Sequence, residues 1–151
     1  MNIDSPICTT KEQSKRLLAL GLKKETADCN VMLTIRGEMY HIGFDMCRYR
    51  DYYFRYGREH NYQPAWSLHR LLKMLPQGVI IAGTEYKLSI DSHLCVEYIS
   101  EEIQSRVVMS GELSNPIRYF WKGDVFDRII CCICWLIKEG YFNKEYLEDK
   151  R

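Results

Sequence analysis

The segment from residue 124 to residue 140 constrains the fold most, because it joins a strong helix start, a wide apolar stripe and a clear helix end. Asp124 is a good N-cap residue whose carboxylate also suits the helix dipole, and Gly140 is a good C-terminal stop. A stripe this wide has to be largely covered, either by a sheet of the same chain or by a second copy of the helix. The stripe consists of Phe126, Ile129, Ile130, Ile133 and Ile137, with Val125, Cys132 and Leu136 at its margins.

Two shorter helices are predicted before this segment. A threonine followed three residues later by Glu or Gln is a capping box, which starts the first helix at Thr9 or Thr10, and Gly21 ends it. Ser67 is the expected N-cap of the second helix, whose leucines recur at helical spacing until Pro76. These leucines are Leu68, Leu71, Leu72 and Leu75, and single turns of helix are expected over 24–28 and 143–147.

Alternating apolar and polar residues predict strands between the helices. Residues 30–45 have the pattern of a hairpin whose only turn signal is Arg36-Gly37-Glu38. In residues 85–90 every second residue is apolar, which is typical of a sheet with one face in water. Further strands are expected over 79–82, 94–99 and 106–109, with turns at Gly83-Thr84 and Asp91-Ser92-His93.

This order of elements predicts an α+β fold, with an antiparallel sheet of about five to six short strands and two to three helices packed mainly on one face. A chain of 151 residues is expected to form a single domain, residues 1–151, because two halves would each have a marginal core.

Charge narrows the class of protein. The 21 Lys and Arg nearly balance the 20 Asp and Glu, and the formal charge of +1 argues against a protein that coats DNA with its whole surface. The N-terminus lacks the basic-then-apolar layout of a signal peptide, and no long apolar run occurs. We therefore expect a cytoplasmic protein without a membrane partner.

The cysteines are expected to be reduced and structural. Their number is seven, and an odd count without an export signal fits reduced thiols better than a disulfide framework. Cys131 and Cys134 can share a helix face, but Cys132 points elsewhere and no second pair with suitable spacing exists. The sequence therefore predicts no metal and no cofactor.

The segment 47–63 is the most unusual stretch, because it alternates arginines with aromatic residues and has no consistent period. Guanidinium groups bind phosphate or carboxylate, and tyrosine rings stack on bases, so the segment is a candidate site for a nucleotide-like anion. Two alternatives are a structural loop with arginines extended over tyrosines into water, and a contact surface for a protein. The candidate residues are Arg48, Arg50, Tyr52, Tyr53, Arg55, Tyr56 and Arg58.

Two tryptophans are candidates to assist that segment. Trp66 precedes the leucine helix, and Trp121 lies in the cluster 119–124, directly before the C-terminal helix. Backbone N–H groups at a helix start can hold an anion, above which Trp121 could stack. An aromatic residue at this position more commonly packs on the first turns of its own helix.

No catalytic residue is assigned. His41, Asp45 and Cys47 could form a thiol–imidazole arrangement, but nothing places Cys47 at a helix N-terminus, where its thiolate would be favoured. The sequence also lacks the nucleophile-elbow, P-loop, metalloprotease and dinucleotide-binding motifs. A protein without enzymatic activity is therefore favoured.

Three parts of the chain carry a resemblance. The first is residues 9–21, Thr-Thr-Lys-Glu-Gln-Ser-Lys-Arg-Leu-Leu-Ala-Leu-Gly, with Glu25-Thr26-Ala27-Asp28 shortly after it. The other two are Pro64-Ala65-Trp66-Ser67-Leu68 and Trp135-Leu136-Ile137-Lys138-Glu139-Gly140-Tyr141. In them the chain resembles a group of short uncharacterised proteins of gut-bacterial phages, prophages and mobile elements. The resemblance implies a genomic setting, in which small proteins often act by binding, and it implies no catalytic residues.

The sequence thus favours a non-enzymatic binding protein of phage or mobile-element origin. It would block a host protein or sequester a small nucleotide-like anionic signal through the Arg/Tyr segment. One alternative is a regulatory protein that binds single-stranded nucleic acid, and another is a small hydrolase or transferase acting on a nucleotide. A homo-oligomer stays open, because the apolar C-terminal helix could pair with a second copy.

Overall fold

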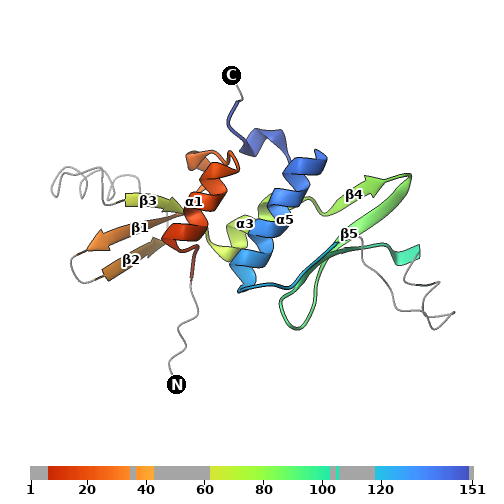
Figure 1. Cartoon of the computed structure of the whole chain (residues 1–151), viewed down its shortest axis with the longest axis horizontal. Coiled ribbons are helices and arrows are strands. Elements are labelled where there is room, and N and C mark those ends of the chain that lie inside the picture. The colour runs from red at the N-terminus through yellow and green to blue at the C-terminus, as the bar shows by residue number, and fades with distance from the viewer. Residues whose placement is uncertain (1–6, 35–36, 43–61, 103–104, 106–117, 150–151) are drawn as a thin grey trace. The chain divides into compact units, whose positions relative to one another are not determined.

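The computed structural model describes residues 7–34, 37–42, 62–102, 105 and 118–149 (Figure 1). The predicted strand 106–109, the hairpin residues 35–36 and 43–45, and most of the segment 47–63 lie outside these residues. The chain divides into two compact units: Met1–Leu72 with Lys144–Arg151, and Lys73–Asn143. The single domain expected from chain length stays a prediction.

Helix α1 (Lys11–Ala19) of the first unit begins as its capping box predicts. The Thr10 hydroxyl accepts the N–H of Gln13 at 3.2 Å, and the Gln13 side chain accepts the N–H of Thr10 at 3.0 Å. After the helix, the chain forms the short 3-10 helix η1 (Lys24–Thr26). Both elements lie where the sequence predicts them, although only α1 has a side-chain cap and η1 has none.

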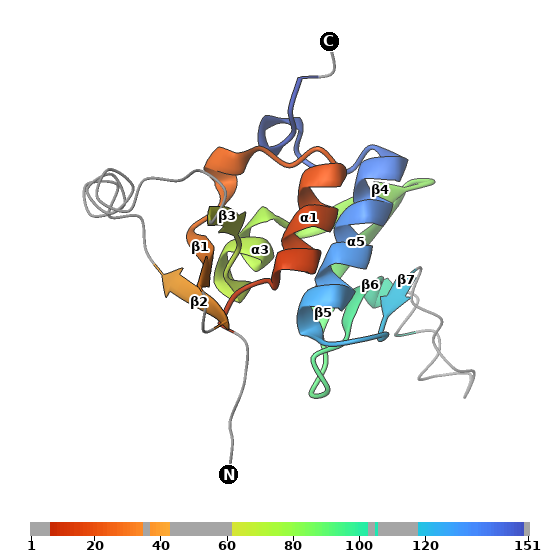
Figure 2. The same ribbon diagram turned by 60° about the vertical axis from the view of Figure 1, so that its left-hand side comes forward.

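The sheet of the first unit has three antiparallel strands in the order β2-β1-β3, which Figure 2 shows beside α1. Strands β1 (Cys29–Thr34) and β2 (Gly37–Ile42) form the predicted hairpin, with Thr34 opposite Gly37, so Gly37 and Glu38 belong to the strand and not to the turn. Strand β3 (Tyr62–Ala65) was not predicted. It lies at the sheet edge, where Pro64 is tolerated because an edge strand need not donate every N–H.

The C-terminal segment of the chain returns to the first unit. The 3-10 helix η3 (Lys144–Tyr146) and the residues after it bond to the segment that follows α1. The N–H of Lys23 donates to the Tyr146 carbonyl at 2.9 Å, and the N–H of Glu148 donates to the Gly21 carbonyl at 2.7 Å. Gly21 has a φ of 95°, so the predicted stop is also the point at which the chain turns toward these residues.

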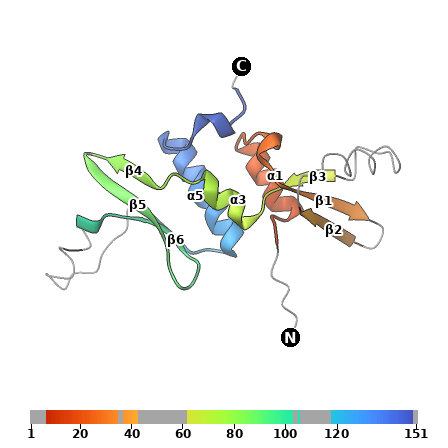
Figure 3. The same cartoon turned by 180° about the vertical axis from the view of Figure 1, so that it is seen from behind.

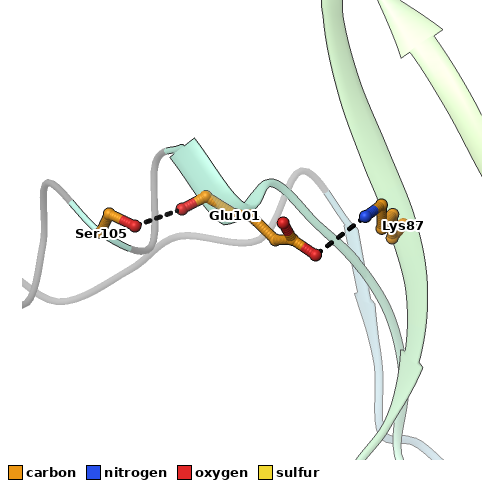
Figure 4. Close-up of polar contacts among 3 residues, drawn as sticks. All are labelled: Lys87, Glu101 and Ser105. Atoms are coloured by element: carbon orange, nitrogen blue, oxygen red, sulfur yellow. Dashed lines mark hydrogen bonds and ion pairs between the residues drawn. The ribbon is translucent and has the colours of Figure 1, made fainter.

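The second unit contains a four-stranded antiparallel sheet in the order β4-β5-β6-β7, whose strands β6 and β7 contact α5. Figure 3 shows β4, β5 and β6 of this sheet. Ala82 and Gly83 form the two-residue turn between β4 and β5, and their φ values of 49° and 80° suit such a hairpin. On the outer face, Lys87 and Glu101 form an ion pair of 2.9 Å, and the Ser105 hydroxyl donates to the Glu101 carbonyl (Figure 4). The strands are β4 (Gly78–Ile81), β5 (Thr84–Ile90), β6 (Val96–Ile99) and β7 (Arg118–Phe120).

Helix α5 (Val125–Glu139) confirms the predicted apolar stripe. Asp124 forms a capping box with Asp127, and Gly140 ends the helix in the left-handed conformation at φ 79°. Six side chains of the helix are buried, and the half-buried Trp135 packs against Tyr98 of β6 and Phe120 of β7. These buried residues are Phe126, Ile129, Ile130, Cys132, Ile133 and Leu136.

The α+β class is confirmed, but the strands form two sheets and not one. Nothing local in a strand specifies which other strand pairs with it, so their division had to come from long-range packing. Helix α3 (Leu68–Met74), which begins after Ser67 as predicted, contains the boundary between the units. Within the described residues, no helix has the length and apolar character needed to cross a membrane.

Candidate functional site

Most of the predicted ligand site cannot be placed. Arg48, Arg50, Tyr52, Tyr53, Arg55, Tyr56 and Arg58 lie outside the described residues, as do Asp45 and Cys47 of the alternative thiol–imidazole arrangement. Trp66 and Trp121 are the two predicted site residues that the structure describes, and it places them in different environments.

Trp66 is a core residue. Its side chain is fully buried, and its indole N–H donates to Thr26 Oγ1 at 2.9 Å. Its backbone is also fixed, because Trp66 and Thr9 exchange hydrogen bonds of 3.0 Å in both directions. The surface contact predicted for this ring is therefore not seen, since burying a large amphipathic ring with its N–H satisfied stabilises the fold.

Trp121, by contrast, is 59% exposed. Its position before α5 predicted packing onto the helix, but Phe120 makes that contact, with its ring centroid 6.2 Å from that of Trp135. The Trp135 ring also contacts Tyr98 and Tyr141, so Phe120 of β7 packs against a cluster of aromatic rings. Trp121 thus follows a strand whose Phe120 packs on α5, and its own side chain is accessible to solvent.

Two more large apolar side chains lie exposed in the same region. Leu94, in the turn between β5 and β6, is 50% exposed, and Tyr119 on β7 is 43% exposed. We call Leu94, Tyr119 and Trp121 the Trp121 surface. Exposed apolar residues scattered singly are ordinary, but a group on one rigid frame is typical of an interaction site.

Arg128 of α5 joins the two backbone segments that carry this surface, the one after β7 and the turn between β5 and β6. Its Nε donates to the Trp121 carbonyl at 2.9 Å, and its Nη1 donates to the His93 carbonyl at 2.8 Å. Because a guanidinium group is small and planar, the two carbonyl groups lie close together. Arg128 therefore holds Leu94, which follows His93, near Trp121.

The Asp91 carboxylate accepts three hydrogen bonds that fix the turn between β5 and β6. Its Oδ1 accepts the N–H groups of His93 and Cys95, each at 2.9 Å, and its Oδ2 accepts the Tyr119 hydroxyl at 3.1 Å. The amide of Cys95, followed by those other donors, holds the pKa of the Asp91 carboxyl below its usual value. The turn and β7 are thereby joined through one carboxylate.

The surroundings of Tyr119 raise the pKa of its phenol. The Cys95 side chain, partial desolvation and the Asp91 carboxylate raise its pKa, in that order of importance. A protonated phenol keeps donating to Asp91, so the ring keeps its orientation.

Leu94 occupies a strained backbone conformation. Its φ is 59°, in the left-handed region that glycine and asparagine adopt easily and leucine does not. The backbone hydrogen bond from the N–H of Leu94 to the Asp91 carbonyl, at 3.0 Å, fixes this geometry. Residues in such disfavoured backbone conformations are concentrated at functional sites. The side chain of Leu94 is half exposed, so burial in the core does not explain why a leucine occupies this position.

Sequence reasoning identified only part of this surface. Tyr119 and Trp121 belonged to the predicted aromatic cluster, and Asp91 belonged to a predicted turn. Leu94 was assigned to the start of a strand, and Arg128 carried no local signal, because its two acceptors lie seven and 35 positions away in the sequence.

The described residues show no arrangement that would hold a metal ion through three or more His, Cys, Asp or Glu side chains. On α5, Cys132 is buried and Cys131 is exposed, so they lie on different sides of the helix. The Trp121 surface can bind through apolar contact and hydrogen bonding.

Comparison with known proteins adds no further assignment: no protein-family model, no curated protein and no solved structure matches this chain.

Proposed function

We propose that this chain is a binding protein that contacts a protein partner through the Trp121 surface. The observation that carries the proposal is the exposed Trp121 beside a strained, exposed Leu94, both held by Arg128. Tryptophan and tyrosine dominate the energetic centres of protein interfaces, because they bury a large area with little loss of side-chain freedom.

Charges of both signs lie around the surface. Arg118 and Lys122 are exposed on either side of Tyr119 and Trp121, Glu97 lies opposite Tyr119 on β6, and Asp124 is exposed after Lys122. The nearby Asp91 accepts three hydrogen bonds within the chain. A partner with an apolar patch and a rim of mixed charge would be complementary. In the genomic setting that the resemblance implies, this partner would be a host protein.

The decisive comparison uses two variants that each remove an apolar side chain with the same exposure. Trp121→Ala removes a 59% exposed side chain from the Trp121 surface, and Ile7→Ala removes a 59% exposed side chain from the first unit. Each tagged protein is incubated with a lysate of the cells that encode it, and a protein captured by the wild type is purified and titrated by calorimetry. We expect Trp121→Ala to weaken its binding at least about 30-fold, the effect of losing about 2 kcal/mol at a hot spot.

Ile7→Ala should bind like the wild type. The proposal is wrong if no captured protein distinguishes the two variants, or if both weaken binding equally while their melting temperatures match that of the wild type.

A nucleotide-like anion bound by Arg48, Arg50, Arg55 and Arg58 stays a separate prediction. The double variant Arg50→Ala, Arg55→Ala should lose such a ligand, observed by native mass spectrometry of protein taken from cells, without a change in melting temperature. An unfolded double variant would make these arginines structural.

A further inference from the structure

Strand β4 has an edge that no described strand covers. It is the first strand in the order β4-β5-β6-β7, and its sequence is Gly78-Val79-Ile80-Ile81. Natural edge strands usually carry a charge, a proline or a bulge that prevents pairing with another chain. This strand has none of these, and its Ile80 is the most exposed of the large apolar side chains that the structure describes, at 69%.

The hydrogen-bond pattern of the hairpin shows which groups face the open edge. The N–H of Leu88 donates to the carbonyl of Gln77 at 2.9 Å, and these residues lie opposite each other when the register Gly78↔Lys87 is extended by one pair. Because bonded and non-bonded pairs alternate in an antiparallel ladder, Val79 also bonds to β5. The N–H and carbonyl groups of Gly78 and Ile80 therefore point away from β5.

We infer that β4 pairs antiparallel with β4 of a second copy of this chain, around a twofold axis at Val79. In this register Gly78 lies opposite Ile80 of the second copy, and the reverse. Both residues have outward N–H and carbonyl groups, so each pair exchanges two hydrogen bonds. Gly78 has no side chain, and the Glu85 side chain of its own copy lies beside it, with Oε1 3.4 Å from the position that a Cβ would occupy. The exposed Ile80 of the other copy packs at this position when the flexible Glu85 side chain turns aside.

Charges on β5 favour this register over one centred on Ile80. Lys87 lies opposite Gly78 and Glu85 lies opposite Ile80, both on the outer face. With the axis at Val79, the residues that lie in line across the joined sheets are Lys87, Gly78, and then Ile80 and Glu85 of the second copy. Each such row therefore has opposite charges at its two ends. With the axis at Ile80, both ends of the central row would be Glu85. Lys87 already bonds Glu101 within its own copy (Figure 4), so these charges select the register and add little affinity.

The inferred contact is independent of the proposed function. Strand β4 and strand β7, which carries Tyr119, are the opposite edges of the sheet, so a dimer through β4 leaves the Trp121 surface open. A contact of one four-residue strand per copy buries little area, which predicts a weak dimer whose fraction rises with concentration.

Sedimentation velocity of the full chain over a range of concentrations tests the inference, with Ile80→Pro and Ile80→Val as the paired variants. Proline removes the outward N–H without touching a bond to β5, whereas valine keeps both the N–H and the β-branched side chain. We expect the wild type and Ile80→Val to dimerise with rising concentration and Ile80→Pro to stay monomeric with an unchanged circular dichroism spectrum.

Hydrogen exchange of the wild type gives a second measurement that does not depend on the proline variant folding. The amides of Gly78 and Ile80 should become protected as the concentration rises, while the amide of Trp121 should not change. A wild type that is monomeric at all concentrations, or a dimer that Ile80→Pro does not disrupt, would overturn the inference. Exchange at Gly78 and Ile80 that is independent of concentration would also overturn it.

Discussion

Replacing Leu94 by glycine and by alanine tests whether the turn beside Trp121 stores backbone strain. Leu94 has a φ of 59°, where a residue with a Cβ is disfavoured by about 1–2 kcal/mol. Glycine removes this penalty. Its greater freedom in the unfolded chain, however, lowers the stability of the folded glycine variant by about 0.5–1 kcal/mol relative to the alanine variant. Both variants lose the half-exposed leucine side chain, so that loss nearly cancels between them. We therefore expect Leu94→Gly to be more stable than Leu94→Ala by about 0.8 kcal/mol, the difference between the midpoints of these two ranges.

The order of the two variants is the diagnostic result. At an ordinary strand or helix position alanine is the more stable of the two by about 0.5–1 kcal/mol, so the prediction has the opposite sign. Urea unfolding followed by circular dichroism measures both free energies, and equal slopes make the two midpoints directly comparable. An alanine variant that is equal to or more stable than the glycine variant would refute the strain at Leu94. Both variants should also bind the protein partner more weakly than the wild type, because both lack the leucine side chain.

Two further predictions concern one buried residue and one titrating residue. Trp66→Phe should lower the free energy of unfolding by about 1–3 kcal/mol, because Thr26 loses the indole N–H that it accepts; an unchanged melting temperature would contradict the core role of Trp66. The amides of Cys95 and His93 lower the pKa of Asp91 in the folded chain. The ionised Asp91 carboxylate therefore stabilises the fold fully at a pH above its unfolded pKa of about 4, and this stabilisation is lost as the pH falls through the lower pKa of the folded chain. Asp91→Asn keeps an oxygen acceptor but does not titrate, and it should lose less stability on acidification than the wild type; parallel pH profiles would show that Asp91 does not contribute.

The sequence predicted the candidate surface only in part. The aromatic residues before α5 were visible, because tyrosine and tryptophan next to a helix cap form a local pattern. That Trp121 is exposed and Trp66 is buried had no local signal, since each ring follows the packing of residues distant in sequence. Trp66 is fixed by Thr9 and Thr26, which precede it by 57 and 40 positions.

The helices were determined by the sequence itself. Thr10 with Gln13 and Asp124 with Asp127 satisfy backbone groups within one turn, and Gly140 ends α5 without steric cost, so these boundaries depend on neighbours only. The long strands β1, β2 and β5 also follow from their alternating side chains.

Tertiary structure alone decided strands β3 and β7 and the partner of each strand. Strands β3 and β7 have four and three residues, too few for a periodic pattern, and each exists because a neighbouring strand supplies its hydrogen bonds. The same reason explains why one expected sheet became two and why residues 146–148 pair with residues 21–23. A strand's alternation states which face is buried, whereas the choice of partner depends on which segments the folded chain brings together.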